Sequence, residues 1–152
     1  MADAVGADHP AVRLSPNGES YGVDDSNPAP LFTAAADILN GIGIAFLELR
    51  ELGPDGTFGA TDVSRLSPLI RQHFHGPIVL NSDYDLTRAK ADLDSGLADA
   101  ISFGRPFLAN PDLVHRLRHG APLNQDRMET YYSQEATGYT DYATLPRNRS
   151  VD

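Results

Sequence analysis

The segment Ile78–Phe103, IVLNSDYDLTRAKADLDSGLADAISF, contains two short apolar runs with a polar, helix-like stretch between them. The runs Ile78–Leu80 and Ala100–Phe103 have the length of buried β-strands. The stretch Asp85–Ser95 has the character of a helix, and Gly96 is placed to end it. A strand, a helix and a second strand in this order predict two parallel strands joined by a crossover helix.

The same alternation extends through most of the chain. Two further apolar runs of strand length are Ala11–Leu14 and Ala45–Leu49. Three further helices are expected: one opened by Asn27–Pro30 and closed by Gly41 and Gly43, one over Thr61–His73 where Pro68 could introduce a kink, and one from Asn110 or Pro111 to Arg118. The alternation predicts a parallel α/β fold, and the pattern alone leaves both a doubly wound sheet and a (β/α) barrel open.

The overall composition describes an acidic chain of about single-domain size. Its 152 residues are 41% hydrophobic, which suffices for a packed core, and the formal net charge is −9. The acidic excess argues against a nucleic-acid partner, because binding phosphates requires clustered Lys and Arg. The absence of cysteine excludes disulfides, thiolate catalysis and zinc-thiolate sites. Neither a signal peptide nor a membrane-spanning apolar run is visible, so we expect a soluble, cytoplasmic protein without a membrane partner.

The stretch Ser102–Leu113, SFGRPFLANPDL, has the features of an anion site at the end of a strand. Gly104 would let the backbone approach a ligand closely, and Arg105 supplies a permanent, forked cation. The N-terminus of a short helix would direct unpaired N–H groups at the same anion. These features suggest a phosphate site. The alternative, of equal weight, is a turn glycine followed by an arginine in a structural salt bridge.

Polar residues at two other strands are also candidates for ligand binding. Arg13 lies within an otherwise apolar strand, where a buried cation needs an anionic partner, either a structural carboxylate or a ligand with delocalised negative charge. Asn81, Ser82 and Asp83 follow a strand, and their backbone N–H groups or side chains could contact a phosphate or a hydroxyl group. For these three residues a capping turn is the alternative.

Two histidine pairs have spacings that invite comparison with metal sites. His73 and His75 would lie on one side of a strand, but no acidic or sulfur ligand accompanies them at a recognisable spacing. His115 and His119 follow one another by one helical turn in an Arg-rich stretch that is expected to face solvent, where a helix C-terminus favours positive charge. No metal site is therefore expected.

The tail after Gly120 has no clear helical or strand period, yet it is rich in aromatic residues. Its tyrosines are Tyr131, Tyr132, Tyr139 and Tyr142, more than a disordered terminus usually contains. We therefore expect the tail to dock on a folded surface.

Five segments together resemble the old yellow enzyme family of flavin-dependent ene-reductases. They are VRLSPNG, LFTAAADILNGIGIAFLELRE, PIVLNSDYD, ADAISFGRPFLANPDLVHRLRHGAPLN and TYY…GYTDY, in order and with natural spacings. The resemblance implies an FMN-binding (β/α)₈ barrel of which this chain is the C-terminal half, strands five to eight. Residues 1–120 would form that half-barrel, and residues 121–152 would form a segment that docks near the flavin site.

The resemblance also implies a set of binding residues. Arg13 would lie beside the N1–C2=O edge of the flavin and favour its reduced, anionic form, which would explain a buried arginine without an acidic neighbour. Relatives often have glycine at the position of Ser82, and the carboxylate of Asp83 should turn away from a phosphate. The residues implied for FMN are Arg13, Asn81, Ser82, Asp83, Phe103, Gly104 and Arg105, and Tyr132 is implied for the substrate. No catalytic residue is assigned to this half.

The implied activity is transfer of a hydride from NAD(P)H through FMN to the activated C=C bond of an α,β-unsaturated carbonyl compound or a nitroalkene. The residues that grip and protonate the substrate would come from strands one to four, which this sequence lacks. We therefore expect activity only after pairing with a complementary N-terminal half-barrel chain, as in a split enzyme. Two alternatives remain: a self-pairing half-barrel that binds a phosphorylated ligand without catalysis, and an inert fragment.

Overall fold

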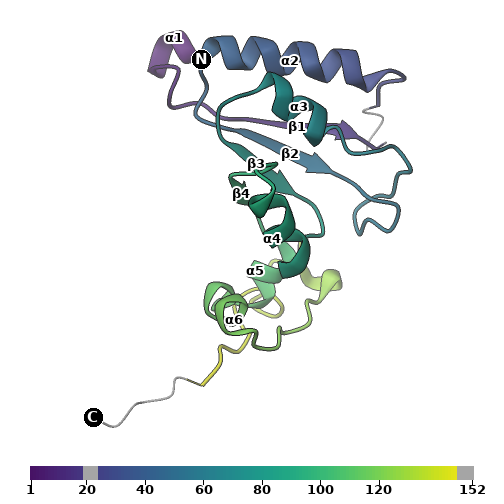
Figure 1. The fold of residues 1–152 in the computed structure, drawn as a ribbon. Helices are drawn as coiled ribbons and strands as arrows, with labels where there is room; N and C mark the ends of the chain where they lie inside the picture. The colour runs from purple at the N-terminus through teal and green to yellow at the C-terminus, as the bar shows by residue number, and fades with distance from the viewer. Residues whose placement is uncertain (19–23, 147–152) are drawn as a thin grey trace. The chain divides into compact units, whose positions relative to one another are not determined.

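A four-stranded parallel sheet forms the centre of the first part of the chain (Figure 1). The computed structural model describes residues 1–18 and 24–146, and the chain divides into two compact units, Met1–Ser102 and Phe103–Asp152. Each strand of the first unit pairs in parallel with the next strand along the sequence. The strands are β1 (Val12–Asn17), β2 (Leu47–Glu51), β3 (Ile78–Asn81) and β4 (Ala100–Ile101).

This strand order decides between the two architectures that the sequence left open. In a doubly wound sheet the strand order reverses at a switch point. In a (β/α) barrel each strand lies beside its predecessor. The order β1-β2-β3-β4 follows the barrel rule. The predicted parallel α/β class is therefore confirmed, and the sheet is that of a partial barrel. Its assignment to strands five to eight stays a prediction.

The helices of the first unit begin and end at local signals in the sequence. They are α1 (Ala2–Val5), α2 (Pro28–Ile42), α3 (Ser67–His73) and α4 (Leu86–Asp94). The helix α2 begins after Asn27 and ends at Gly43, which takes the left-handed conformation with φ 76°. The carboxylate of Asp85 caps α4 by accepting a hydrogen bond from the backbone N–H of Arg88 at 2.7 Å. The helices predicted at these two places are confirmed.

The helix expected over Thr61–His73 is wrong in its first half, because α3 begins only at Ser67. Pro68 lies in the first turn, where no N–H group is needed, so it starts the helix instead of kinking it. Glu51, the last residue of β2, accepts hydrogen bonds from the backbone N–H groups of Leu66 (2.6 Å) and Ser67 (2.8 Å). This carboxylate satisfies N–H groups that the start of a helix leaves unpaired.

Alternating side chains give the sheet an apolar face and a polar face. On the apolar face Leu47, Leu49, Ile78 and Leu80 are at most 1% exposed. The helices α2, α3 and α4 cover this face, and each contributes at least one buried residue. The opposite side, which we call the polar face, bears the half-buried or exposed side chains of Arg13, Glu48, Arg50, Asn81 and Ser102.

The second unit contains two short helices where the sequence predicted one. They are α5 (Arg105–Ala109) and α6 (Leu113–His119), and a 3₁₀ turn η1 (Met128–Thr130) follows them. The predicted helix start at Asn110 or Pro111 is wrong, because α6 begins at Leu113, and α5 was not predicted. Pro111 disfavours a helical conformation at the residue before it, and Asn110 accordingly has φ −135° and ψ 89°. This break separates α5 from α6.

Arg116 is buried inside the second unit, with 4% of its surface exposed. Its guanidinium donates hydrogen bonds to Asp112 Oδ1 (2.7 Å) and to the carbonyl oxygens of Pro122 (2.6 Å) and Ala143 (2.8 Å). The other carboxylate oxygen of Asp112 accepts from the backbone N–H of Leu145 at 2.7 Å. The expectation that this stretch of α6 faces solvent is wrong for Arg116, because the side chain fastens the C-terminal tail to α6.

The two compact units divide at Ser102, whereas the predicted segments 1–120 and 121–152 were defined by their role in a barrel. That division stays a prediction, and residues 147–152 lie outside the described part of the chain. Among the helices that the structure describes, none combines the length and the apolar character that crossing a membrane requires.

Candidate functional site

In the first unit the carboxyl ends of the parallel strands lie along one edge of the sheet, the edge at which barrel enzymes build their sites. β1 ends at Asn17, which is 4% exposed. Its side-chain amide donates to the carbonyl oxygens of Leu52 (3.0 Å) and Val63 (3.1 Å), and its Oδ1 accepts from the N–H of Leu52 (2.9 Å). These bonds hold the loop that follows β2 against the end of β1.

Arg13 lies on the polar face of the edge strand β1, with 52% of its side chain exposed. Its Nη2 donates to Oδ1 of Asn81 at 3.0 Å, and its Nε lies 3.9 Å from Oε2 of Glu48. The prediction of a buried arginine without an acidic neighbour is therefore wrong for this chain. Glu48 is the register partner of Arg13 on β2, so the parallel pairing itself brings the carboxylate to the guanidinium.

Three more hydrogen bonds complete a ring of side chains on the polar face. The amide Nδ2 of Asn81 donates to Ser102 at both its hydroxyl (2.8 Å) and its carbonyl oxygen (3.0 Å). The hydroxyl of Ser102 donates to Oε1 of Glu48 at 2.9 Å. Residues from β1, β2 and β3 and from the residue after β4 thus form one cluster, which we call the polar ring: Arg13, Glu48, Asn81 and Ser102.

The turn after β3 holds two successive residues in the left-handed region. Ser82 has φ 98° and Asp83 has φ 47°, conformations that are costly for residues with a Cβ. The carboxylate of Asp83 accepts hydrogen bonds from the backbone N–H (3.0 Å) and hydroxyl (2.8 Å) of Thr57, which lies in the loop after β2. That the carboxylate turns away from a phosphate stays a prediction. The unusual backbone is consistent with the glycine that the resemblance implies at position 82.

In the second unit, Gly104 directly precedes α5, and Arg105 is the first residue of that helix. The guanidinium of Arg105 lies 3.6 Å from a carboxylate oxygen of Asp126, and both side chains are 27% exposed. The structural salt bridge that the sequence left open as the alternative is therefore present, and a phosphate role stays a prediction. Phe103 is half-buried, whereas Tyr132 is 93% exposed.

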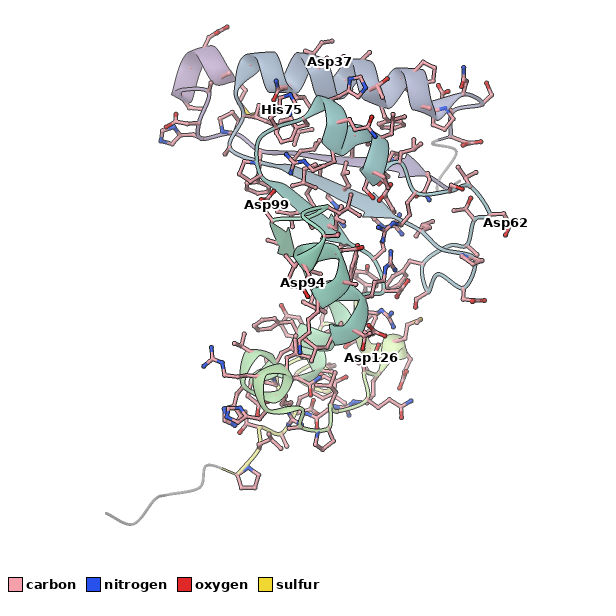
Figure 2. The ribbon with its side chains drawn as sticks, in the orientation of Figure 1. Asp37, Asp62, His75, Asp94, Asp99 and Asp126 are labelled. Atoms are coloured by element: carbon pink, nitrogen blue, oxygen red, sulfur yellow. The ribbon has the colours of Figure 1, made fainter. Side chains whose placement is uncertain are left out.

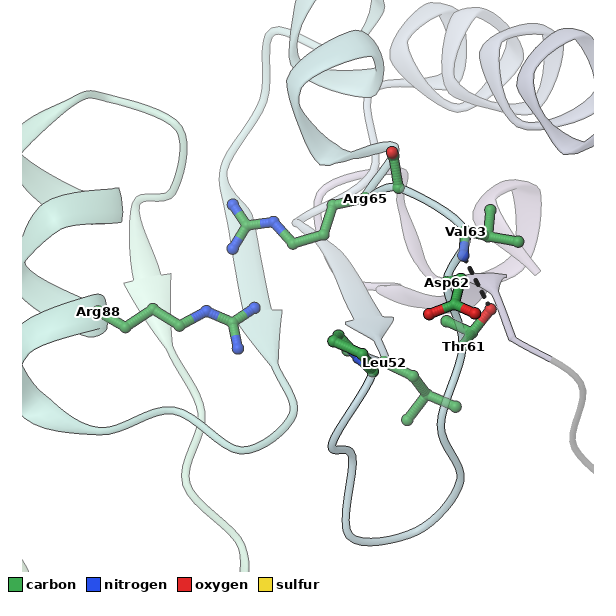
Figure 3. Close-up of a pocket in the computed structure, with 9 residues that line it drawn as sticks. Leu52, Thr61, Asp62, Val63, Arg65 and Arg88 are labelled. Atoms are coloured by element: carbon green, nitrogen blue, oxygen red, sulfur yellow. Dashed lines mark hydrogen bonds between the residues drawn. The ribbon is translucent and has the colours of Figure 1, made fainter.

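A pocket of about 400 Å³ lies beside the loop that follows β2 (Figure 3). Two arginines from different segments, Arg65 before α3 and Arg88 on α4, contribute to its wall. Arg65 donates to both carboxylate oxygens of Asp92, at 2.9 and 3.3 Å, and Arg88 lies 4.2 Å from the centre of the Tyr84 ring. Both cations thus have protein partners. The lining residues are Leu52, Gly53, Pro54, Thr61, Asp62, Val63, Ser64, Arg65 and Arg88.

The cluster behind this pocket is built for stability. The hydroxyl of Tyr84 donates to Oδ2 of Asp92 at 2.6 Å. The pKa of Tyr84 is raised, mainly by burial and secondly by this hydrogen bond. Burial alone would raise the pKa of Asp92, but hydrogen bonds from Arg65 and Tyr84 outweigh it and the pKa is lowered. The carboxylate stays ionised, and the phenol stays neutral.

The first histidine pair does not form the arrangement that the sequence suggested, whereas the second pair lies one helical turn apart on α6, as expected. His73 is the last residue of α3, so it does not share a strand with His75, and its Nδ1 lies 3.0 Å from Oδ1 of Asp37 on α2. Figure 2 labels Asp37 and His75. The rings of His115 and His119 are 4.3 Å apart, and Nδ1 of the second is 3.0 Å from the carbonyl oxygen of the first. Within residues 1–18 and 24–146, no group of three or more His, Cys, Asp or Glu residues is placed to hold a metal ion.

The sequence reasoning missed Glu48 and Ser102 as members of the candidate site. Glu48 lies at the middle of an apolar strand, as Arg13 does, and two charged residues at the same place in neighbouring strands were a signal that they could pair. Ser102 lies inside the apolar run Ala100–Phe103 and was considered only as the first residue of the glycine-arginine segment. Pairing of the strands is what brings these residues together.

Comparison with known proteins identifies relatives of this chain. Residues 1–124 match the model of the NADH:flavin oxidoreductase / NADH oxidase family. The chain is 35% identical over 157 residues to putative 12-oxophytodienoate reductase 10 of Oryza sativa subsp. japonica, a match that covers 99% of the chain and 49% of that protein. It is 38% identical over 146 residues to a 12-oxophytodienoate reductase-like protein of Solanum lycopersicum, covering 95% of the chain and 38% of that protein.

Solved structures show the same relationship. The old yellow enzyme homologue from Zymomonas mobilis superposes with a TM-score of 0.92 at 54% identity, covering 95% of this chain and 41% of that one. Morphinone reductase superposes with a TM-score of 0.87 at 37% identity, covering 97% of this chain and 39% of that one. This chain therefore spans less than half the length of each of these relatives. Morphinone reductase itself has been solved in complex with tetrahydroNAD.

Proposed function

Because the chain belongs to the NADH:flavin oxidoreductase / NADH oxidase family, whose old yellow enzyme members use FMN with NAD(P)H as hydride donor, we propose that it is the FMN-binding C-terminal half of an ene-reductase barrel. The proposed substrates are small molecules with an activated C=C bond, either α,β-unsaturated carbonyl compounds or nitroalkenes. The observation that carries the proposal is the close similarity, over nearly the whole chain, to the old yellow enzyme homologue of Zymomonas mobilis.

On the first unit, Arg13 is the residue proposed to contact the ring system of FMN. A guanidinium has five N–H donors, and within the described residues Arg13 uses one of them, toward Asn81. The half-exposed Arg13 therefore retains donors and charge for an electron-rich ligand edge. We assign Arg13 to the N1–C2=O edge of the flavin, where a cation favours the reduced form. When bound, FMN supplies the hydride carrier.

By the family resemblance, two separate sets of backbone and side-chain donors are assigned to the FMN phosphate. On the first unit these are the N–H groups of the turn Ser82–Asp83, because backbone N–H groups in turns can bind anions. On the second unit they belong to Gly104 and Arg105. Phe103 is proposed to contact the flavin and Tyr132 the substrate. The support for these last assignments is the family resemblance of the segments that contain them.

Catalysis is proposed to require the other half of the barrel, whether on the same polypeptide or on a second one. The chain covers 41% of the Zymomonas mobilis homologue, and the family resemblance assigns substrate gripping and protonation to the first four strands. The N-terminal half-barrel is therefore the proposed partner. The cytoplasmic location expected from the sequence stays a prediction.

The phosphate assignment is tested with Arg105→Ala in the barrel completed by its N-terminal half. Loss of a charge-assisted contact is expected to weaken FMN binding by about 1.5–3 kcal/mol, which is roughly one to two orders of magnitude in affinity. Riboflavin lacks the phosphate, so its affinity should not change. Arg118→Ala, an exposed arginine of the same unit, is the matched control. Equal losses for FMN and riboflavin would show that the role of Arg105 is only structural, as in its salt bridge with Asp126.

The activity itself is tested by NAD(P)H oxidation that depends on an added enone. We expect activity and a flavin absorbance band when this chain and the N-terminal half are combined, and no activity from this chain alone. Enone reduction by the chain alone would refute the half-barrel proposal. The non-catalytic alternative would be favoured if the chain self-associates and binds phosphate but shows no activity, either alone or with the N-terminal half.

A further inference from the structure

The polar ring has a fixed direction of hydrogen bonding from its cation to its anion. A carboxylate can only accept, so the Ser102 hydroxyl that lies 2.9 Å from Glu48 must be the donor. That hydroxyl then accepts from the amide of Asn81, whose Oδ1 is left to accept from Arg13. The hydroxyl of Ser102 and the amide of Asn81 are therefore each held in one orientation. Through them the carboxylate of Glu48 fixes the position of Arg13, to which it is not directly hydrogen-bonded.

The same carboxylate also acts on Arg13 through space. Oε2 of Glu48 is 3.9 Å from Nε of Arg13, and only 19% of the Glu48 side chain is exposed, compared with 52% for Arg13. The less exposed member of this pair is thus the anion. Water screens it less than it screens the guanidinium, so its field opposes that of Arg13 at the polar face.

Two other charged side chains near the polar face, Arg50 and Asp83, are held by partners in the loop after β2. Arg50 lies two residues beyond Glu48 on β2, and its Nη2 donates to the carbonyl oxygen of Phe58 at 3.1 Å. Asp83 directs its carboxylate to Thr57. Among the described residues of this face, Glu48 is the carboxylate that the strand register places opposite Arg13.

We propose that Glu48 is a positioning residue that holds Arg13 through Ser102 and Asn81 and lowers the reduction potential of the bound flavin. The inference rests on the proposed function, because it takes Arg13 to lie beside the flavin. Arg13 alone would favour the anionic, reduced flavin, and a nearby carboxylate counteracts part of that effect. Glu48 thereby sets how strongly the reduced flavin donates its hydride.

The test is the midpoint potential of FMN in the completed barrel. Glu48→Gln keeps the shape and an acceptor for Ser102 but removes the charge, so the potential should shift to a more positive value while FMN affinity changes little. Glu48→Met removes the same charge without a polar group and should shift the potential in the same direction, which keeps the test available if one variant folds poorly. Glu48→Asp retains the charge and should stay nearer the wild-type potential. Asp94→Asn, at the exposed carboxylate that ends α4 in the same unit, is the control for loss of a charge away from the polar face.

Arg13→Met separates this inference from the proposed function. It should shift the potential to a more negative value. If Arg13→Met shifts the potential and both Glu48→Gln and Glu48→Met leave it unchanged, the role of Glu48 is overturned and the proposed function stands. If none of the three variants changes the potential, the assignment of Arg13 to the flavin is overturned together with this inference. Failure of the wild-type barrel to bind FMN overturns both.

Discussion

Replacement of Arg116 by methionine tests whether this buried arginine fastens the C-terminal tail. The change keeps a long side chain of similar reach and removes three charge-assisted hydrogen bonds, to Asp112 and to the carbonyl oxygens of Pro122 and Ala143. Because Arg116 is 4% exposed, water cannot replace these bonds without opening the unit. The variant therefore leaves Oδ1 of Asp112 and the carbonyl oxygen of Pro122 without this donor, whereas the carbonyl oxygen of Ala143 keeps a hydrogen bond from Asn124 at 2.8 Å.

The expected loss follows from the burial of the pair. A hydrogen bond to a charged group contributes about 1.5–3 kcal/mol, but the three bonds share one side chain and their contributions do not add. Removal of one partner of a buried ion pair costs about 3–5 kcal/mol in all, and this is the loss of unfolding free energy that we expect. Asp112 retains its bond from the N–H of Leu145, which limits the damage.

Urea titration of the full chain followed by circular dichroism gives the unfolding free energy, and hydrogen exchange at the Leu145 amide reports on the tail. The control is Arg118→Met on the same helix, an exposed arginine whose loss should change stability by less than about 0.5 kcal/mol. If Arg116→Met costs no more than this control and exchange at Leu145 stays slow, the tail is held by other contacts and the reasoning is refuted.

Three further predictions concern the first unit. Tyr84→Phe removes the hydroxyl that donates to Asp92 and should lower the unfolding free energy by about 1.5–3 kcal/mol in a urea titration; a neutral result would contradict the role of that bond. Ser82→Gly should raise the unfolding free energy by about 1 kcal/mol, because glycine relieves φ 98° but gains entropy when unfolded; a loss would show that the serine is not strained. The pKa of Asp92 is lowered in the folded chain, so its ionised form contributes stability above the unfolded pKa of about 3.9, and that contribution is lost as the pH falls through the folded pKa. Urea midpoints measured over that acid range should therefore show Asp92→Asn converging on wild type as the pH falls, and a constant difference would exclude the linkage.

The strands and two of the helices were predictable because their signals are local. Short apolar runs between turn-forming residues predict strands directly. Asn27 and Gly43 mark the ends of α2, and Asp85 and Gly96 mark those of α4, without reference to any other part of the chain. The start of α3 was missed because it depends on Glu51, a residue of β2 that supplies the acceptor for its first N–H groups.

Burial and pairing of charged residues were not predictable from local sequence. Arg13 was expected to be buried because its strand is apolar, but the strand lies at the edge of the sheet and its register partner is Glu48. Arg116 was expected to be exposed because its neighbours are basic, but its acceptors include Ala143, in a tail without periodicity. The candidate flavin residues came from the family resemblance. The residues around Arg105 alone favour a salt bridge and a phosphate contact equally.

The loop between β2 and α3 has a shape that is encoded outside the loop. Asn17 binds backbone atoms near both ends of the loop, and Arg50 binds a carbonyl oxygen within the loop. Asp83 binds a backbone N–H group of the loop, and Glu51 binds the N–H groups where the loop ends. Bonds to backbone atoms are available to almost any residue that occupies the loop. Mutation can therefore change most loop side chains, and with them the surface offered at this end of the sheet, while inheritance of the four anchoring residues preserves the path of the chain.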